Sequence, residues 1–422
     1  MRVYRYIFVL CLLSFVFSPA KAQDDARLCE QTLTGTARYM GFGGAMTAIG
    51  GDPSAVRVNP AGLGLYRRME VLVTMGGSKG MFILPEVSFV LAAKRNNFMF
   101  SYHSLHNYNR DLLGEAKNDA SLGALMAGKN INIGMLYCDE PYSKTSSLRV
   151  RESGFNNAFN FDWAMRISHQ WYVGAGFHIQ SYRFSSSATF NEHFDIVNDN
   201  FEHLYNRNES YLRYTGSSCT FSFGAIYRPT GWLRLGLSLQ TPSLGILYLR
   251  TDGTFTSLTD SVRASSVEHN GRVNDFHQPL RLSLSTAFQI GAYALIALQY
   301  DYAHQKYMDD IHTLRAGFEV IPVMGLYING GYACESAFRK TDRLVPIDPT
   351  FERQDTYFFN QRWKQYASVA VGYRGTYVIA QVAYQYSWQR FNLYAHESTA
   401  APFNFANDTH RVVVTIGWHH NY

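Results

Sequence analysis

The chain has 422 residues, of which 15% are aromatic, including 29 tyrosines and 29 phenylalanines. Its formal net charge is +5, and subtracting the three charges of Arg2, Arg5 and Lys21 leaves about +2 for the rest of the chain. So small a charge excludes a nucleic-acid-binding protein that relies on a strongly basic surface. CxxC and HExxH patterns are missing from the sequence, and no spacing singles out a catalytic pair, so we predict no metal, no cofactor and no catalytic residues.

Residues 1–22 have the pattern of a secretory signal peptide. Arg2 and Arg5 precede an apolar run at 7–17, and Ala20-Lys21-Ala22 forms a small-x-small cleavage site. The run is shorter than the ~20 apolar residues that a transmembrane helix needs. Cleavage leaves four cysteines, which are Cys29, Cys138, Cys219 and Cys334. An oxidising compartment would allow one disulfide among them, but the sequence does not indicate which two cysteines would form it.

Residues 23–67 are rich in small residues and glycine and do not have a strand pattern. Gly41-Phe42-Gly43-Gly44 follows no strand, which argues against a phosphate-binding loop. We predict a compact plug, in which glycines allow positive φ angles and close packing. Asp52-Pro53-Ser54-Ala55 predicts the start of a helix, with Asp52 as N-cap and Pro53 at the first helical position.

Residues 68–422 show repeated segments of alternating polarity, and we predict fourteen strands. In 376–393, for example, valine, alanine and aromatic side chains oppose three glutamines. The predicted strands are 69–76, 82–94, 97–106, 155–168, 171–187, 211–228, 232–241, 278–289, 292–303, 311–321, 324–336, 363–374, 376–393 and 410–422.

The connections between these strands alternate between two lengths. The tight ones are Arg95-Asn96, His169-Gln170, Pro229-Thr230-Gly231, Ile290-Gly291, Pro322-Val323 and Gly375. The long ones are 107–154, 188–210, 242–277, 337–362 and 394–409. A transmembrane barrel has short periplasmic turns and long outer loops, whereas a soluble sandwich has no reason to sort its connections in this way.

The last strand supports the same fold. Val412, Val414, Ile416, Trp418 and Tyr422 share one face of it. Soluble proteins rarely leave such a strand as an open edge, and a barrel closes it against the first strand. We therefore predict an all-β, 14-stranded antiparallel transmembrane β-barrel in the outer membrane of a Gram-negative bacterium. Its partners would be the membrane lipids and, through the strand ending at Tyr422, the barrel-assembly machinery.

Strand parity places a set of polar side chains in the lumen. Such groups are usually paired or hydrated and structural. The alternative is that Arg234 and Arg315 receive an anionic head group, because guanidinium matches carboxylate in bidentate fashion. His103 and His106 lie three apart on a strand, which predicts opposite faces and no shared metal. The inward set is Asp162, Arg166, His178, Gln180, Arg234, Arg281, Asp301, Arg315, Glu319 and Gln381.

Three motifs in the N-terminal segment resemble the hatch of the FadL/TodX (OMPP1) family of outer-membrane transport proteins, as found in Bacteroidetes. They are Arg38-Tyr-Met-Gly-Phe-Gly-Gly-Ala, Asp52-Pro-Ser-Ala-Val and Asn59-Pro60-Ala61-Gly62-Leu63. The resemblance implies a hatch at 23–67 inside a barrel at 68–422. It also implies passive uptake of long-chain fatty acids or aromatic hydrocarbons, with exit through a lateral gap in the wall.

The resemblance assigns Asn59, Pro60 and Ala61 to hatch shape and gating, although a rigid turn at the first strand explains them equally well. Gly43 and Gly44 are expected to be packing glycines. The loop 107–154 would form apolar helices that catch ligand, through Leu112, Leu113, Leu122, Leu125 and Met126.

Some proteins of similar architecture are instead shuttle or scaffold subunits of the type IX protein secretion system. Such a protein would bind secretion-system proteins and transport nothing itself. A non-specific porin disagrees with the predicted plug, because a plugged barrel should conduct ions poorly.

Overall fold

The computed structural model describes residues 28–78, 81–93, 95–117, 142–196, 204–258, 262–273, 277–304, 309–337, 358–394 and 403–420. Its strands are β1 Met69–Ser78, β2 Met81–Ala92, β3 Asn96–Asn107, β4 Arg110–Lys117, β5 Tyr142–Arg166, β6 Trp171–Ile196, β7 Leu204–Tyr227, β8 Leu233–Gln240, β9 Leu244–Leu258, β10 Val262–Val273, β11 Leu280–Ile290, β12 Ala294–His304, β13 Ile311–Val323, β14 Leu326–Glu335, β15 Phe358–Gln361, β16 Lys364–Arg374, β17 Val378–Tyr394 and β18 Phe403–His420. The helices are α2 Ala37–Gly41, α3 Pro53–Val58 and the 3-10 helix η2 Pro60–Leu65.

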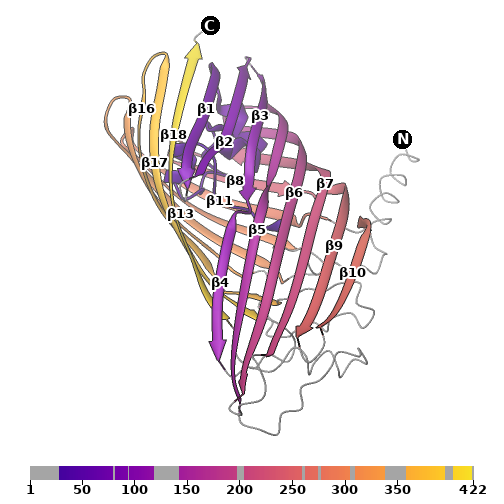
Figure 1. The fold of residues 1–422 in the computed structure, drawn as a ribbon. Helices are drawn as coiled ribbons and strands as arrows, with labels where there is room; N and C mark the ends of the chain where they lie inside the picture. Colours follow the sequence, from indigo (N-terminus) through magenta and orange to yellow (C-terminus); the bar gives the residue numbers. More distant parts are fainter. Residues whose placement is uncertain are drawn as a thin grey trace, which may run out of the picture.

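In the described residues these strands form one closed antiparallel barrel (Figure 1). In four cases two consecutive elements form a single wall strand, because they pair one after the other with the same neighbouring wall strand. β3 and β4, for example, both pair with β5. The other three pairs are β8/β9, β10/β11 and β15/β16. The eighteen elements are therefore fourteen wall strands, as predicted. Closure comes from β1 and β18, which pair from Met69↔His420 to Ser78↔Arg411.

The tight turns gather at one end of the barrel together with the C-terminus, at the top of Figure 1; we call this the turn end and its opposite the distal end. The predicted tight connections are confirmed, except that the chain turns between β13 and β14 at 324–325, rather than at Pro322-Val323. Among the described residues, no helix is long and apolar enough to cross a membrane.

The predicted long loops are largely wrong, because strand structure continues through much of them. β5, β6 and β7 run for 25, 26 and 24 residues, whereas a membrane-spanning strand needs only about 9–11. Leu112 and Leu113 lie in β4, so they are not helical. Leu122, Leu125 and Met126 fall outside the described residues.

The outward face of β6 shows where the membrane band ends. Near the turn end it carries Trp171, Val173, Ala175, Phe177 and Ile179, and toward the distal end it carries Ser181, Arg183, Ser185, Ser187 and Thr189. A lipid-facing wall must be apolar, and a wall in water need not be. The first half of the strand therefore spans the membrane, and the second half extends the barrel beyond it.

The opposite-face prediction for the two histidines of β3 is also wrong. The ladder with β5 shifts register between Ser104 and His106, so one extra residue occupies this strand. Such a bulge reverses the alternation of faces. His103 and His106 are consequently both buried.

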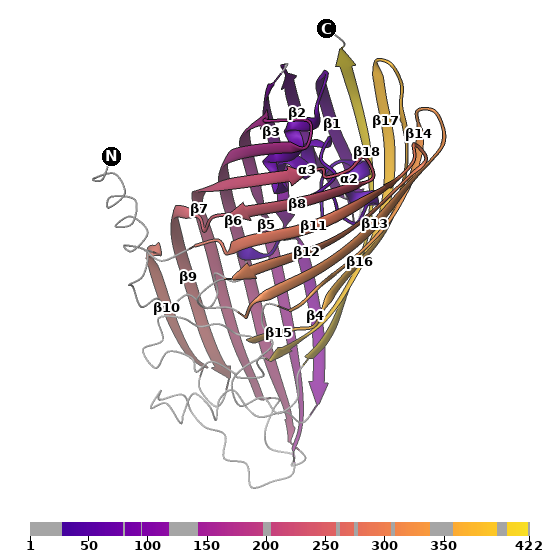
Figure 2. The same cartoon turned by 180° about the vertical axis from the view of Figure 1, so that it is seen from behind.

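Residues 28–66 lie inside the barrel, with α2 and α3 enclosed by the wall in its upper half (Figure 2). We call them the inner segment. The helix start predicted at Asp52 is confirmed, since its side chain accepts from the Ser54 amide and Pro53 is the first residue of α3. The core of the molecule is the contact between this segment and the wall, where Phe42, Ala45, Met46 and Ala48 pack against residues of β11, β12, β14 and β16.

Candidate functional site in the lumen

The motif Asn59-Pro60-Ala61 sits in a notch made by two wall glycines. Gly174 of β6 and Gly224 of β7 are direct cross-strand partners. A Cβ on Gly174 would lie 2.5 Å from the Pro60 carbonyl carbon, and one on Gly224 would lie 1.8 Å from Asn59 Oδ1. No side chain fits at either position, so this glycine pair fixes where the inner segment meets the wall.

A second notch holds the glycine-rich turn after α2. Gly317 of β13 and Gly331 of β14 are also cross-strand partners. Added Cβ atoms would lie 2.2 Å from the Phe42 ring and 2.1 Å from the Gly43 amide nitrogen. Gly43 and Gly44 have φ angles of 63° and 75°, which glycine adopts without strain. The prediction of packing glycines with positive φ is confirmed.

Asn59 ties the inner segment to itself and to the wall. Its amide nitrogen donates to the Thr47 carbonyl at 2.7 Å and to the Ala225 carbonyl of β7 at 3.4 Å. Its Oδ1 accepts from the Ala61 amide at 3.1 Å and caps η2. The motif thus builds a rigid, fully bonded turn; its part in gating stays a prediction.

Charged side chains fasten the middle of the inner segment. Arg38 forms a bidentate pair with Glu319 of β13, with Nε–Oε2 and Nη2–Oε1 distances of 2.7 and 2.8 Å. Asp52 accepts from Thr36 Oγ1 at 2.7 Å, and Ser54 donates to Glu86 of β2. Burial, with the nearby charge of Glu86, raises the pKa of Asp52 to about 6.

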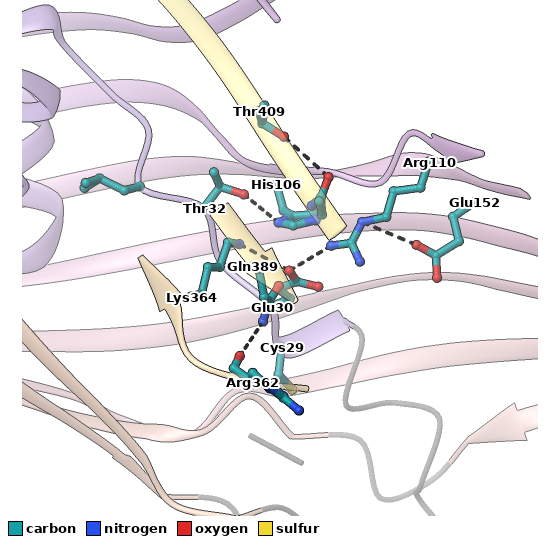
Figure 3. Close-up of polar contacts among 12 residues, drawn as sticks. Cys29, Glu30, Thr32, His106, Arg110, Glu152, Arg362, Lys364, Gln389 and Thr409 are labelled. Atoms are coloured by element: carbon teal, nitrogen blue, oxygen red, sulfur yellow. Dashed lines mark hydrogen bonds and ion pairs between the residues drawn. The ribbon is translucent and has the colours of Figure 1, made fainter. Parts of the chain in front are cut away.

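On the distal side, the first residues of the inner segment are clamped by a buried ion cluster (Figure 3). Glu30 Oε1 lies 2.9 Å from Arg110 Nη2 of β4 and 3.2 Å from Lys364 Nζ of β16. Thr32 bonds His106 Nδ1 at 2.7 Å through its hydroxyl. This strap, residues 28–36, therefore joins wall strands that lie far apart in the sequence.

The strap also lies behind a discontinuity in the wall. The ladder between β2 and β3 ends at Glu86↔His103, so residues 81–83 of β2 pair only with β1, and residues 84–85 lie at a register shift in that pairing. Pro85 has no N–H to offer a neighbouring strand there. On the other side of the break, the Thr32 amide donates to the Leu105 carbonyl and His103 Nε2 lies 3.1 Å from the Thr34 carbonyl.

The two arginines predicted as head-group ligands are not brought together. Arg315 pairs with Asp301 at 2.7 Å and lines a small lumen cavity of about 60 Å³, and its Nη1 has no hydrogen-bond partner among the described residues. Arg234 donates to the Ile49 carbonyl at 3.4 Å and to Gln289 at 2.5 Å, away from that cavity. Arg315 is therefore placed to meet a ligand in the cavity, whereas Arg234 holds the inner segment.

The interior of the distal half also contains an aromatic cluster. Tyr108, Tyr182, Phe184 and Tyr214 form a buried cluster with leucines of β9 and the start of the strap. Tyr108 and Phe184 meet edge-on, with ring centroids 4.9 Å apart. The cluster thus packs directly against the first residues of the strap, Leu28 and Cys29.

The cysteines lie far from any reactive arrangement in the described chain. Cys219 and Cys334 are free thiols on different strands. Cys29 is buried in the strap, with its Sγ 4.0 Å from the His277 carbonyl. Cys138 lies outside the described residues. The same residues contain no group of three histidine, cysteine or acidic side chains arranged to hold a metal ion.

Sequence reasoning missed the glycine notches and the Glu30 cluster. The glycines lie in strands, and the register that makes them cross-strand partners cannot be predicted from the sequence alone. Glu30, Arg110 and Lys364 come from three distant parts of the chain. The only available signal was the placement of glycines at inward positions of predicted strands, where a side chain would otherwise be expected.

No protein-family model matches the chain, and no curated protein matches it. Several solved structures, however, match its fold. A FadL homologue from Pseudomonas aeruginosa superposes with a TM-score of 0.56 at 12% identity, covering 92% of this chain and 99% of its own. The monoaromatic hydrocarbon channel CymD gives 0.56 at 11% (93% and 99%), and the Pseudomonas putida toluene transporter TodX gives 0.53 at 11% (92% and 99%). The chain therefore has the fold of these channels over nearly its whole length.

Proposed function

We propose that this protein is a FadL-type channel of the Gram-negative outer membrane that takes up hydrophobic small molecules passively, and that the inner segment is its hatch. The observation that carries the proposal is the combination of this channel fold with a lumen filled by a segment fastened to the wall on several sides. The turn end then faces the periplasm and the distal end the outside. A signal peptide at 1–22 fits export to this location.

The route begins at the buried aromatic cluster around Tyr182 and Phe184, which lies beyond the membrane band and would have to open to admit the ligand. It continues to the break between β2 and β3, where the strap closes the wall from within. Movement of residues 28–36 would connect the two. The ligand would be a long-chain fatty acid or an aromatic hydrocarbon, and Arg315, beside the lumen cavity, is the candidate for a carboxylate head group.

The direct test is uptake of a labelled long-chain fatty acid, and separately of labelled toluene, by cells that lack their own channel and express this chain. We expect uptake above the empty-vector level for at least one of the two. Deleting residues 29–61 or replacing Asn59 by alanine should change the rate. Absence of uptake, with folded protein present in the outer membrane, would contradict the proposal.

The Arg315 assignment has its own test. Arg315→Ala should lower fatty-acid uptake relative to toluene uptake, and Arg234→Ala should alter both ligands alike, because Arg234 contacts the hatch rather than the cavity. Unchanged fatty-acid uptake in Arg315→Ala would remove Arg315 as a head-group ligand.

A scaffold function in type IX protein secretion is the second candidate. It is favoured by the lumen cavity of about 60 Å³, far below the roughly 300–1,000 Å³ of ordinary ligand pockets. The polar outer face of the distal half would then be the docking surface. Recovery of secretion-system proteins with this chain, together with absent uptake, would favour the scaffold.

A further inference from the structure

A second region of the molecule, at the turn end, has the composition of a binding site for an anionic group. A cavity of about 590 Å³ opens there between the end of the hatch and the wall. Its charged lining consists of Arg67, Arg68 and Arg374 against the single carboxylate of Glu70. Counting histidine as neutral, the cavity therefore carries two more positive than negative charges.

The two surplus charges belong to Arg67 and Arg68. Glu70 is already paired with Arg374 at 2.5 Å. Arg67 Nη1 donates only to the Gly64 and Tyr66 carbonyls, at 3.3 and 3.4 Å, and Arg68 Nη1 lies 3.4 Å from His419 Nε2. Both arginines are exposed, and neither forms an ion pair within the described chain. Their guanidinium groups thus remain available to an acceptor.

The rest of the lining suits the body of a lipid. Leu65, Tyr66, Met324 and Tyr373 line the same cavity, and Met324 and Tyr373 are exposed at the rim. Tyr66 is 5% exposed, and its buried hydroxyl has no hydrogen-bond partner in the described residues. A molecule with acceptor oxygens at one end and an acyl chain at the other would match both parts.

The neighbouring cavity, deeper in the barrel, sets a limit on how far an anion can enter. It holds about 270 Å³ and shares Glu70 and Arg374 with the first. Asp52 and Glu319 also line it, against Arg38. With three carboxylates and two guanidinium groups its lining is net negative, so an anionic group is favoured in the outer cavity and repelled from the inner one.

We propose that the 590 Å³ cavity at the periplasmic end binds the anionic head group, phosphate or carboxylate, of an acyl amphiphile whose chain lies along the wall toward Tyr373. Arg67 and Arg68 contact the head group. Two sources share this chemistry, an anionic phospholipid of the inner leaflet and an anionic ligand leaving the barrel. The periplasmic location rests on the orientation proposed above, and the second source rests also on the proposed uptake function.

The test uses the full chain in a nonionic detergent, titrated by equilibrium dialysis with radiolabelled lysophosphatidylglycerol and palmitate. Lysophosphatidylcholine and hexadecanol serve as ligands without net charge. Arg67→Ala/Arg68→Ala should weaken binding of both anions about tenfold or more and leave the other two ligands unchanged. The matched control, Arg95→Ala/Arg228→Ala, removes two charges near the same end but outside the cavity lining, and should retain wild-type affinity.

Equal affinities for charged and uncharged ligands, or equal losses in the two double variants, would overturn the proposal. Mass spectrometry of co-purified lipid separates the sources. Phosphatidylglycerol retained by the wild type and lost from the Arg67/Arg68 variant supports a resident phospholipid. Arginine-dependent palmitate binding without retained phospholipid supports a departing ligand. Toluene uptake by the same variant tests channel function separately, since toluene has no head group.

Discussion

The membrane half and the distal half of the wall have opposite polarity. On β6 the outward face changes from Phe177 and Ile179 to Ser181 and Arg183 within a few residues. The inward face changes in the other direction, from His178 and Gln180 to Tyr182 and Phe184. One continuous strand thus obeys the rules of a lipid-facing barrel for half its length and those of a water-soluble protein for the other half.

This contrast teaches that the two halves hold the inner segment by different means. In the membrane half, backbone fits against backbone at the glycine notches. In the distal half, the strap is held by the buried ion cluster around Glu30. The first kind of contact resists movement because it leaves no room. The second can be broken by removing one charge, so the strap is the part of the inner segment that is easiest to release.

The largest effect should come from Glu30→Ala. It leaves the buried cations Arg110 and Lys364 without this carboxylate, and removing one member of a buried ion pair typically costs about 3–5 kcal/mol. Amide hydrogen exchange in residues 28–36 should accelerate roughly 100-fold or more. Asp111→Ala, which breaks the exposed pair with Arg149, should change exchange little. Similar behaviour of the two variants would contradict the clamp.

The position of the membrane boundary is tested by lysine substitutions on the outward face of β5. Phe161→Lys should destabilise the barrel by roughly 2–4 kcal/mol, whereas Ser153→Lys, on the same face, should cost about 0–1 kcal/mol. Urea titrations of folding into lipid vesicles give both values. Phe161→Ala separates the loss of the ring from the gain of charge. A large cost at Ser153 would move the membrane boundary toward the distal end.

Gly224→Ala should displace Asn59, because the added Cβ has no room beside its Oδ1. Overpacking of this kind costs typically about 1–3 kcal/mol. Loosening the hatch in the membrane half should raise ion conductance in planar bilayers. Gly231→Ala is the control, since a Cβ there meets nothing within 4 Å. Unchanged conductance with Gly224→Ala would mean that the notch does not seal the lumen.

The smallest effect concerns pH. Because the pKa of Asp52 is raised to about 6 by burial and Glu86, its protonated form favours the docked hatch. That contribution is present at about pH 4 and is lost as the pH rises through 6. After correction for intrinsic rates, exchange in 53–58 should be slower at pH 5 than at pH 7.5. Asp52→Asn should reduce this difference without removing it, because Glu70 and Glu86 face the same group and their carboxyls remain to titrate.

The sequence was sufficient for the strand number, for the tight turns apart from the one between β13 and β14, and for the helix start at Asp52, because alternation and capping are local signals. It was insufficient for the distal half. There the outward face is polar and the inward face is apolar or small, so the pattern resembles a loop with scattered aromatics. The bulge near Leu105 also made the prediction wrong that His103 and His106 lie on opposite faces of the strand, because that prediction assumed unbroken alternation.

The site was predictable only in part. Asn59, Gly43 and Gly44 stood out through local motifs, and the structure places each against the wall. Their partners could not be found, because Gly174↔Gly224 and Gly317↔Gly331 are set by register between strands. The contrast between Arg234 and Arg315 depends in the same way on which part of the hatch each one meets.

The central claim is that the strap must move for ligand to pass. The most direct measurement is fatty-acid and toluene uptake by a Thr32→Cys/His106→Cys variant, whose side chains touch in the closed state. Cys29, Cys138, Cys219 and Cys334 are replaced by serine, and a reducible bifunctional thiol reagent joins the new pair. We predict that cross-linking stops uptake and that reduction restores it, with single-cysteine variants unaffected. Undiminished uptake in fully cross-linked cells would contradict the account.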